Sequence, residues 1–137
     1  THGLLLLTND GELTNLLIHP RYHIPKTYLL KIAGQVSQDH IDKLTNGVVL
    51  EDGMTAKAYA KVIQRRKDAT IIELTIFEGR KRQIRRMCDV LKIELSDLER
   101  IRFGNLNIDD LKIGEYREVT GKEIEKLKNL LKIKAVT

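Results

Sequence analysis

The chain has 137 residues and a net charge of +5, with 42% hydrophobic and 31% charged residues. This balance is typical of a globular protein, and the length suffices for one hydrophobic core. No apolar run approaches the ~20 residues that a membrane-spanning helix needs. The single cysteine, Cys88, excludes an internal disulfide and a cysteine-based zinc site. These features favour one cytoplasmic domain with no membrane segment and no metal.

The predicted elements begin with the apolar run Leu4–Thr8, which favours a buried strand. Asn9 with Glu12 three residues later has the form of a helix-start capping pair, so we expect a helix that ends at His19 and Pro20. Three further elements follow in the first half: a strand over 27–33, a short helix over 38–44 and a loop over 47–54 with a turn at its Asp-Gly pair.

The second half begins with a predicted β-hairpin, whose strands are 56–63 and 71–77. A helix over 80–91, a strand over 98–108 that is bent at Gly104–Asn105, and a strand over 115–119 come next. Thr120 and Glu123 then form a capping box that opens a last helix, with Ile124, Leu127 and Leu131 facing inward. Strands and helices mix without regular alternation. This favours an α+β fold with a largely antiparallel mixed sheet that is flanked by helices.

The basic excess is concentrated in one segment. Between Lys61 and Arg86 there are nine basic and three acidic residues, so this segment is +6 while the remainder of the chain is −1. A local basic patch is typical of a protein that binds a polyanion such as nucleic acid. A solvated charged surface remains an equally open interpretation at this point.

The predicted helix over 80–91 is strongly amphipathic. Arg82 and Arg86 are expected to face solvent, whereas Lys81 and Arg85 lie on the border with the apolar side. A border arginine can pack its aliphatic stem over the core and place its guanidinium at the rim of a pocket. Arg80 and Lys81 also lie near the helix start, where the helix dipole favours anions. The apolar side is formed by residues at helical spacing, Ile84, Met87, Cys88 and Leu91.

Four stretches, in this order along the chain, resemble the pseudouridine synthase family that modifies ribosomal RNA. Residues 1–11 are similar to the tail of its first motif and residues 19–28 to its second motif. Residues 78–87 are similar to its third motif, and residues 114–117 to the segment before its C-terminal helix. The resemblance implies that residues 1–137 are part of the catalytic domain, without the family's N-terminal RNA-binding domain.

The family's catalytic aspartate belongs to the pattern Gly-Arg-Leu-Asp-x-x-Thr-x-Gly, whose last three positions correspond to Thr1, His2 and Gly3. The aspartate is therefore expected three residues before Thr1, outside this sequence, and we expect the chain alone to be inactive. The resemblance assigns Tyr28 to packing on the target base and Arg85 to an ion pair with the aspartate. It requires no cofactor. The residues expected to bind RNA are all basic: Arg80, Lys81, Arg82, Arg86 and Lys26.

These roles are physically reasonable. A uridine must leave its stack before its glycosidic bond can be cut and remade, and an aromatic ring such as Tyr28 can support the unstacked base. A carboxylate then acts near the sugar and base in an enclosed site. A neighbouring guanidinium such as that of Arg85 keeps this carboxylate ionised. Without the motif, Tyr28 is equally well a packing residue.

The function that this resemblance implies is isomerisation of specific ribosomal RNA uridines to pseudouridine, by a cytoplasmic enzyme that takes part in ribosome biogenesis and acts as a monomer. Two alternatives stay open. The chain could be a non-catalytic RNA-binding module with a basic helix, or a protein-interaction domain whose charges are merely solvated. Tyr28 and Arg85 at one cleft near the start of the chain would favour the enzyme over both.

Overall fold

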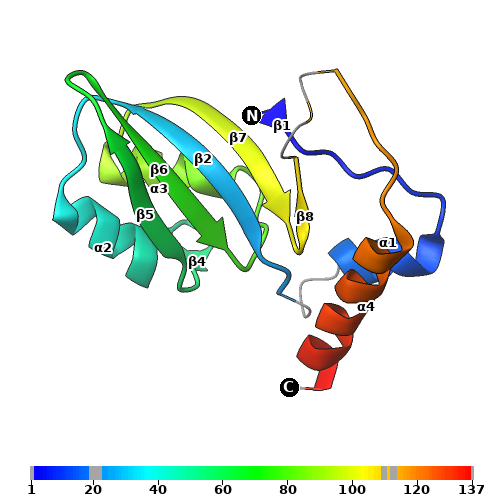
Figure 1. Ribbon diagram of the computed structural model, residues 1–137. Helices are drawn as coiled ribbons and strands as arrows, with labels where there is room; N and C mark the ends of the chain where they lie inside the picture. The colour runs from blue at the N-terminus through cyan, green and yellow to red at the C-terminus, as the bar shows by residue number, and fades with distance from the viewer. Residues whose placement is uncertain (1, 19–22, 109–110, 112–113, 137) are drawn as a thin grey trace.

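The computed structural model describes residues 2–18, 23–108, 111 and 114–136, and only the backbone of Leu16 and residues 131–136. A curved mixed sheet dominates the molecule (Figure 1). Its strand order is β1-β7-β2-β6-β5, with β8 paired to β7. The β1–β7 pair is parallel, and the other pairs are antiparallel. The strands are β1 (His2–Gly3), β2 (Lys26–Ala33), β5 (Tyr59–Arg65), β6 (Ala69–Ile76), β7 (Leu95–Phe103) and β8 (Leu106–Asn107).

Helices α2 (Gln38–Asn46) and α3 (Gln83–Leu91) cover one face of the sheet (Figure 1). The main core lies between these helices and the sheet, because every second side chain of β2 and β6 is apolar and points to this face. Leu30 pairs with Ile72 across the two strands, and both are fully buried with Met87 of α3. Helices α1 (Gly11–Ile18) and α4 (Gly121–Val136) lie beyond one end of the sheet (Figure 1). This architecture confirms the predicted α+β class.

The predicted strand over Leu4–Thr8 is wrong. Parallel pairing with β7 involves only His2 and Gly3, opposite Glu99 and Arg100. Two residues further along, Arg102 and Phe103 of β7 pair with β8 instead. The outer edge of β7 is therefore occupied where a longer β1 would need it, and the leucine run continues without a partner strand.

Two helix starts differ from the sequence prediction. The cap of α1 is Asp10 rather than Asn9, because the Asp10 carboxylate accepts a hydrogen bond of 3.0 Å from the Leu13 amide. Helix α3 begins at Gln83, not at residue 80, because its N-cap Arg82 has a left-handed backbone with φ of 52°. The predicted end of α1 at His19 and Pro20 lies outside the described residues.

The turn at Asp52–Gly53 belongs to a short hairpin formed by β3 (Val49–Leu50) and β4 (Gly53–Met54). The predicted bend at 104–105 is the turn between β7 and β8. Residues 115–119 form no strand, contrary to the prediction. The capping box at the start of α4 is confirmed, since the Thr120 amide donates to Glu123 and the Glu123 amide donates back to the Thr120 hydroxyl.

Candidate active site

Tyr28 lies on the face of the sheet that α3 covers. It is directly opposite Leu74 on β6 and Arg100 on β7. Its partly buried side chain packs against the main core, to which Ile84 and Cys88 of α3 also belong. The Tyr28 side chain is therefore held by the core without being fully enclosed.

Arg85 projects from the same helix between these core residues. It is partly buried, in agreement with its border position on the helical wheel. Its positive charge favours the thiolate of Cys88, but burial outweighs this effect and raises the pKa of that thiol to about 12. Arg85 thus lies on the helix that packs over the face of the sheet carrying Tyr28, beside a thiol that is protonated at neutral pH.

Lys26 occupies the start of β2, two residues before Tyr28. Its ammonium lies 5.9 Å from the centre of the Phe103 ring. A side chain on Gly79 would place its Cβ 3.2 Å from the Lys26 Nζ, so the third motif runs directly past this cation. Burial lowers the pKa of Lys26, the charge of Arg100 lowers it further, and Glu78 opposes the shift. Lys26 is therefore held in a partly desolvated cluster of cations rather than in bulk solvent.

Arg100 is a member of this site that the sequence did not reveal. Its guanidinium donates two hydrogen bonds to the Leu4 carbonyl, with Nε at 3.0 Å and Nη2 at 2.7 Å, and lies 5.3 Å from the centre of the Phe103 ring. The Leu4 amide donates to the Arg100 carbonyl. Arg100 thus joins the tail of the first motif to the strand beside Tyr28. A basic residue in an alternating strand gives no signal of such a role.

His2 fastens the same segment to β7. Its Nε2 lies 2.9 Å from a carboxylate oxygen of Asp97, and its Nδ1 lies 3.3 Å from Glu99. The hydrogen bond from His2 lowers the pKa of the Asp97 carboxyl. Because Gly3, Arg100 and Tyr28 are neighbours across three adjacent strands, the motif tail runs two strands away from the tyrosine.

The remaining predicted RNA-binding residues fall into two groups. Lys81 and Arg82 are exposed in the turn that precedes α3. Arg80 and Arg86 instead contact the β3–β4 hairpin, and Arg86 forms a two-pronged ion pair with Asp52. Arg86 was expected to face solvent, but its side chain is partly covered by this contact.

No group of three His, Cys, Asp or Glu side chains among the described residues is arranged to hold a metal ion. Nor do those residues include a helix that is long and apolar enough to cross a membrane.

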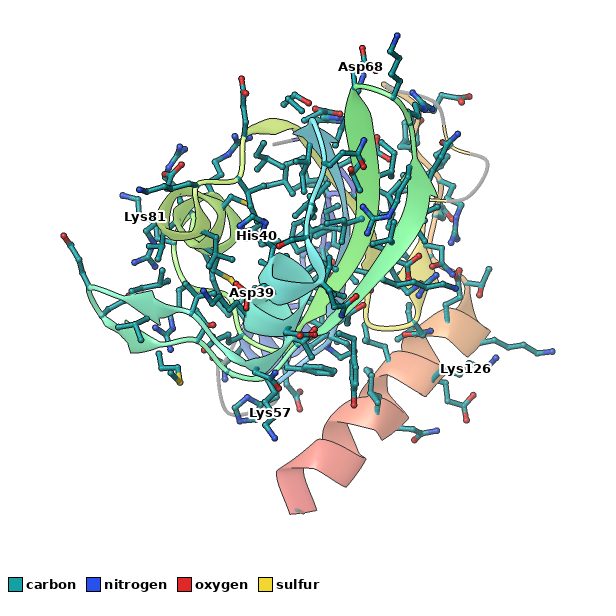
Figure 2. The ribbon with its side chains drawn as sticks, turned by 90° about the vertical axis from the view of Figure 1, so that its left-hand side faces the viewer. Asp39, His40, Lys57, Asp68, Lys81 and Lys126 are labelled. Carbon is teal, nitrogen blue, oxygen red and sulfur yellow. The ribbon has the colours of Figure 1, made fainter. Side chains whose placement is uncertain are left out.

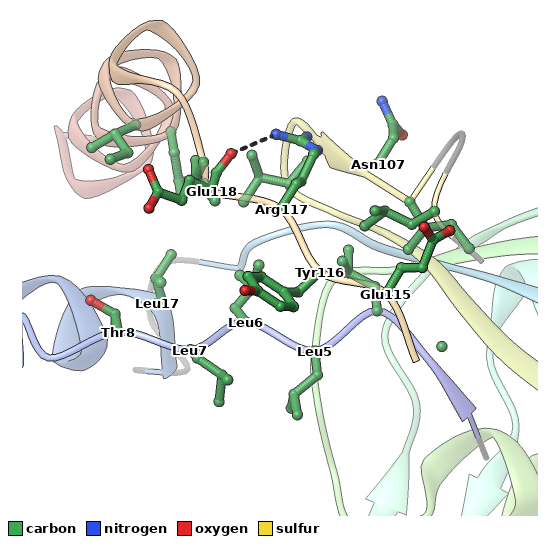
Figure 3. Close-up of a pocket in the computed structure, with 18 of the residues that line it drawn as sticks. Leu5, Leu6, Leu7, Thr8, Leu17, Asn107, Glu115, Tyr116, Arg117 and Glu118 are labelled. Atoms are coloured by element: carbon green, nitrogen blue, oxygen red, sulfur yellow. Dashed lines mark hydrogen bonds between the residues drawn. The ribbon is translucent and has the colours of Figure 1, made fainter. Parts of the chain in front are cut away.

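A separate apolar cavity of about 860 Å³ opens between the leucine run and residues 114–119 (Figure 3). Helices α1 and α4 both border it. Leu5 and Leu7 are 72% and 88% exposed, and Tyr116 is 90% exposed. The Arg117 guanidinium donates to the Glu118 carbonyl along one rim (Figure 3). With a lining dominated by leucines, this cavity offers little to an anionic ligand and differs in kind from the cation cluster around Lys26.

The structure defines an α+β protein in which two cations, Lys26 and Arg100, lie near the Phe103 ring, and Arg100 is hydrogen-bonded to the tail of the first motif. Comparison with known proteins specifies the family. Residues 1–89 match the family described as RNA pseudouridylate synthase. The chain belongs to this family.

Individual relatives agree. The ribosomal large subunit pseudouridine synthase B of Bacillus subtilis (strain 168) is 46% identical over 95% of this chain and 54% of its own length. An uncharacterized RNA pseudouridine synthase of Aquifex aeolicus (strain VF5) is 35% identical over 99% of this chain and 55% of its own length. A crystal structure of a pseudouridylate synthase superimposes with a TM-score of 0.84 at 34% identity, covering 91% of this chain and 54% of that one. The chain spans about half the length of the curated relatives it matches.

Proposed function

We propose that the protein to which this chain belongs isomerises uridines of ribosomal RNA to pseudouridine. In this proposal Tyr28 packs on the unstacked uracil, and Arg85 pairs with the catalytic aspartate. That aspartate stands three residues before Thr1. The reaction breaks the bond between the sugar and the base nitrogen and forms one to a base carbon; that carbon loses its proton and the nitrogen gains one, so no redox cofactor enters it. The enzyme works as a monomer in the cytoplasm.

One observation carries this proposal: the tail of the first motif is held two strands from Tyr28, with only β7 between them. Gly3 is opposite Arg100, and Arg100 is opposite Tyr28. An aspartate a few residues upstream of Gly3 is within chain reach of the tyrosine, because each extended residue spans ~3.3 Å. A non-catalytic RNA-binding module has no need for this juxtaposition.

The cation cluster supports an anionic substrate. Lys26 and Arg100 share the Phe103 ring, and the charge of Arg100 lowers the pKa of Lys26. A phosphate of the target nucleotide would relieve this repulsion between like charges. Lys81 and Arg82, exposed at the start of α3, extend the basic surface for the flanking RNA.

The test is pseudouridine formation in ribosomal RNA transcripts, mapped by chemical modification and primer extension. We expect turnover by the protein that includes the segment before Thr1, and none after its aspartate is replaced by asparagine, because removal of a nucleophile abolishes the reaction. Residues 1–137 alone should be inactive. Pseudouridine formation by residues 1–137, or by the asparagine variant, would contradict the proposal.

A further inference from the structure

The β3–β4 hairpin presents two apolar side chains to solvent. Val49 and Met54 are directly opposite each other on its two strands and are 64% and 60% exposed. Leu50, the neighbour of Val49, is buried and anchors the hairpin to the core. The backbone of Gly47 must stay bare here, because a Cβ would lie 2.8 Å from the Thr55 carbonyl and 3.0 Å from Met54. The hairpin is therefore closely packed at its base, and the exposed pair belongs to two ordered strands rather than to a frayed loop.

Arg80 braces this hairpin. Its guanidinium donates to three successive backbone carbonyls of the hairpin, at 3.4 Å for Asp52, 3.0 Å for Gly53 and 2.7 Å for Met54. Its Nε also donates to the Glu78 carboxylate at 3.2 Å. An arginine whose donors are used in this way has little capacity left for a phosphate.

Arg86 provides a second brace. Its two terminal nitrogens donate to the two carboxylate oxygens of Asp52 at 2.9 and 3.3 Å, and its Nε donates to the Lys81 carbonyl. This hydrogen bonding lowers the pKa of the Asp52 carboxyl. The planar, two-pronged geometry fixes orientation as well as distance.

Glu78 connects the hairpin to the candidate active site. Its carboxylate accepts hydrogen bonds from the Ala56 amide, just after β4, and from the buried side chain of Gln83. The same carboxylate acts on the pKa of Lys26. The hairpin projects from the body of the molecule on the side of Lys81 (Figure 2). It is therefore a rigid arm beside the cation cluster.

We propose that the β3–β4 hairpin is an RNA-contacting arm, with Val49 and Met54 packed on bases or ribose and with Arg80 and Arg86 acting as its positioning residues. The charge of the surroundings selects RNA as the occupant. Asp52 is neutralised by two arginines, and the cations of Lys81 and Arg82 are exposed beside it. Apolar side chains, methionine among them, can insert between base steps of nucleic acids. The inference rests on the proposed function, because it assumes an RNA substrate.

The first test measures the affinity of this chain for a fluorescently labelled large-subunit ribosomal RNA transcript at low salt. The double variant Val49→Ser/Met54→Ser should bind more weakly than the parent, because two apolar contacts with bases or ribose would be lost. The matched control is Ile63→Ser, an exposed apolar residue on β5, which should bind like the parent. Equal binding by the double variant and the parent would overturn the inference.

The second test asks whether Asp52→Asn strengthens or weakens RNA binding. If Arg86 bound phosphate itself, Asp52→Asn would release its guanidinium and remove a negative charge, so RNA binding would tighten. If Arg86 braces the hairpin, Asp52→Asn should weaken binding although it removes a negative charge, and adding it to Arg86→Ala should weaken binding no further. Tightening by Asp52→Asn contradicts the inference.

Glu51 gives an independent check at the tip of the hairpin. It is exposed and acidic, so Glu51→Gln should strengthen binding if RNA passes there and should have no effect otherwise. Circular dichroism of each variant establishes that the fold is retained. If no hairpin variant changes RNA binding, while the parent chain binds RNA and the longer protein forms pseudouridine, only the inference about the hairpin is rejected. Absence of RNA binding by the parent chain rejects the arm, and loss of pseudouridine formation by the longer protein separately rejects the proposed function.

Discussion

Gly3 is the residue at which the backbone of the first motif has least freedom. Its φ is +107°, and an added Cβ would lie 2.4 Å from the Arg100 carbonyl oxygen. A side chain would therefore collide with backbone that cannot move without disrupting β7. The Thr-x-Gly ending of the motif has a direct physical reason in this contact.

We predict that Gly3→Ala detaches β1 from β7. The hydrogen bond from the Leu4 amide to the Arg100 carbonyl should be lost, because left-handed strain and the collision together cost about 1–3 kcal/mol or more. Hydrogen exchange should show fast exchange at Leu4 with unchanged protection at Leu30. Gly121→Ala, at a position with no neighbour within 4 Å, is the control. Retained protection at Leu4 would contradict this account of the motif.

Glu123 makes the start of α4 sensitive to acid. Hydrogen bonds from Arg117 and from the Thr120 backbone lower the pKa of its carboxyl from 4.5 to about 2. A carboxyl whose pKa is lower in the folded state stabilises the fold fully above pH 4.5, and this contribution disappears as the pH falls toward 2. We predict that the Thr120 amide loses its protection from hydrogen exchange over this pH range, and NMR can measure that loss. Glu123→Gln should remove the pH dependence, and an identical acid transition in that variant would refute the assignment.

The roles of Arg80 and Arg86 could not be predicted from the sequence. Their motif is recognisable in the sequence, and their charge indicates a polyanion site. Their partner Asp52 is separated from Arg80 by 28 residues and from Arg86 by 34. Only tertiary structure brings this carboxylate to them, so the sequence could not distinguish a brace from a phosphate ligand. Arg100 was missed for the same reason, because its partner is a backbone carbonyl 96 residues away.

Elements that depend on local periodicity were predicted well. The hairpin of β5 and β6, the strand β2 and the capping box of α4 all follow from patterns within a few residues. The leucine run after β1 was not, because an uninterrupted apolar run does not specify whether a sheet edge is available to pair with. Residues 115–119 likewise form no strand.

The leucine run leads to a prediction at the scale of elements. Leu7 is 88% exposed, whereas Leu74 on β6 is fully buried. Leu7→Ser should change the free energy of unfolding of this chain by no more than about 0.5 kcal/mol, whereas Leu74→Ala should cost about 2–5 kcal/mol because it leaves a cavity. Urea unfolding measures both. A large loss of stability from Leu7→Ser would mean that the run is packed after all.

For the whole molecule, Cys88 is a natural probe of global unfolding. It is almost fully buried in the main core, and burial raises the pKa of its thiol to about 12. A thiol reagent should therefore react only through opening of the core. We predict a labelling rate at neutral pH that follows the unfolding equilibrium and rises in Leu74→Ala. Labelling of the native chain as fast as that of the unfolded chain would contradict the buried position.

The central claim at this scale is that Tyr28, Arg85 and the first motif form one catalytic site, separate from the RNA-binding surface. The most direct test compares Arg85→Ala with Arg82→Ala in the protein that includes the segment before Thr1, by single-turnover pseudouridine formation at saturating enzyme. We predict that Arg85→Ala reduces the rate at least about a hundredfold, as expected for loss of a group that acts on the catalytic carboxylate. Arg82→Ala should retain the rate under saturation and only weaken binding. A normal rate for Arg85→Ala together with a lost rate for Arg82→Ala would contradict the claim.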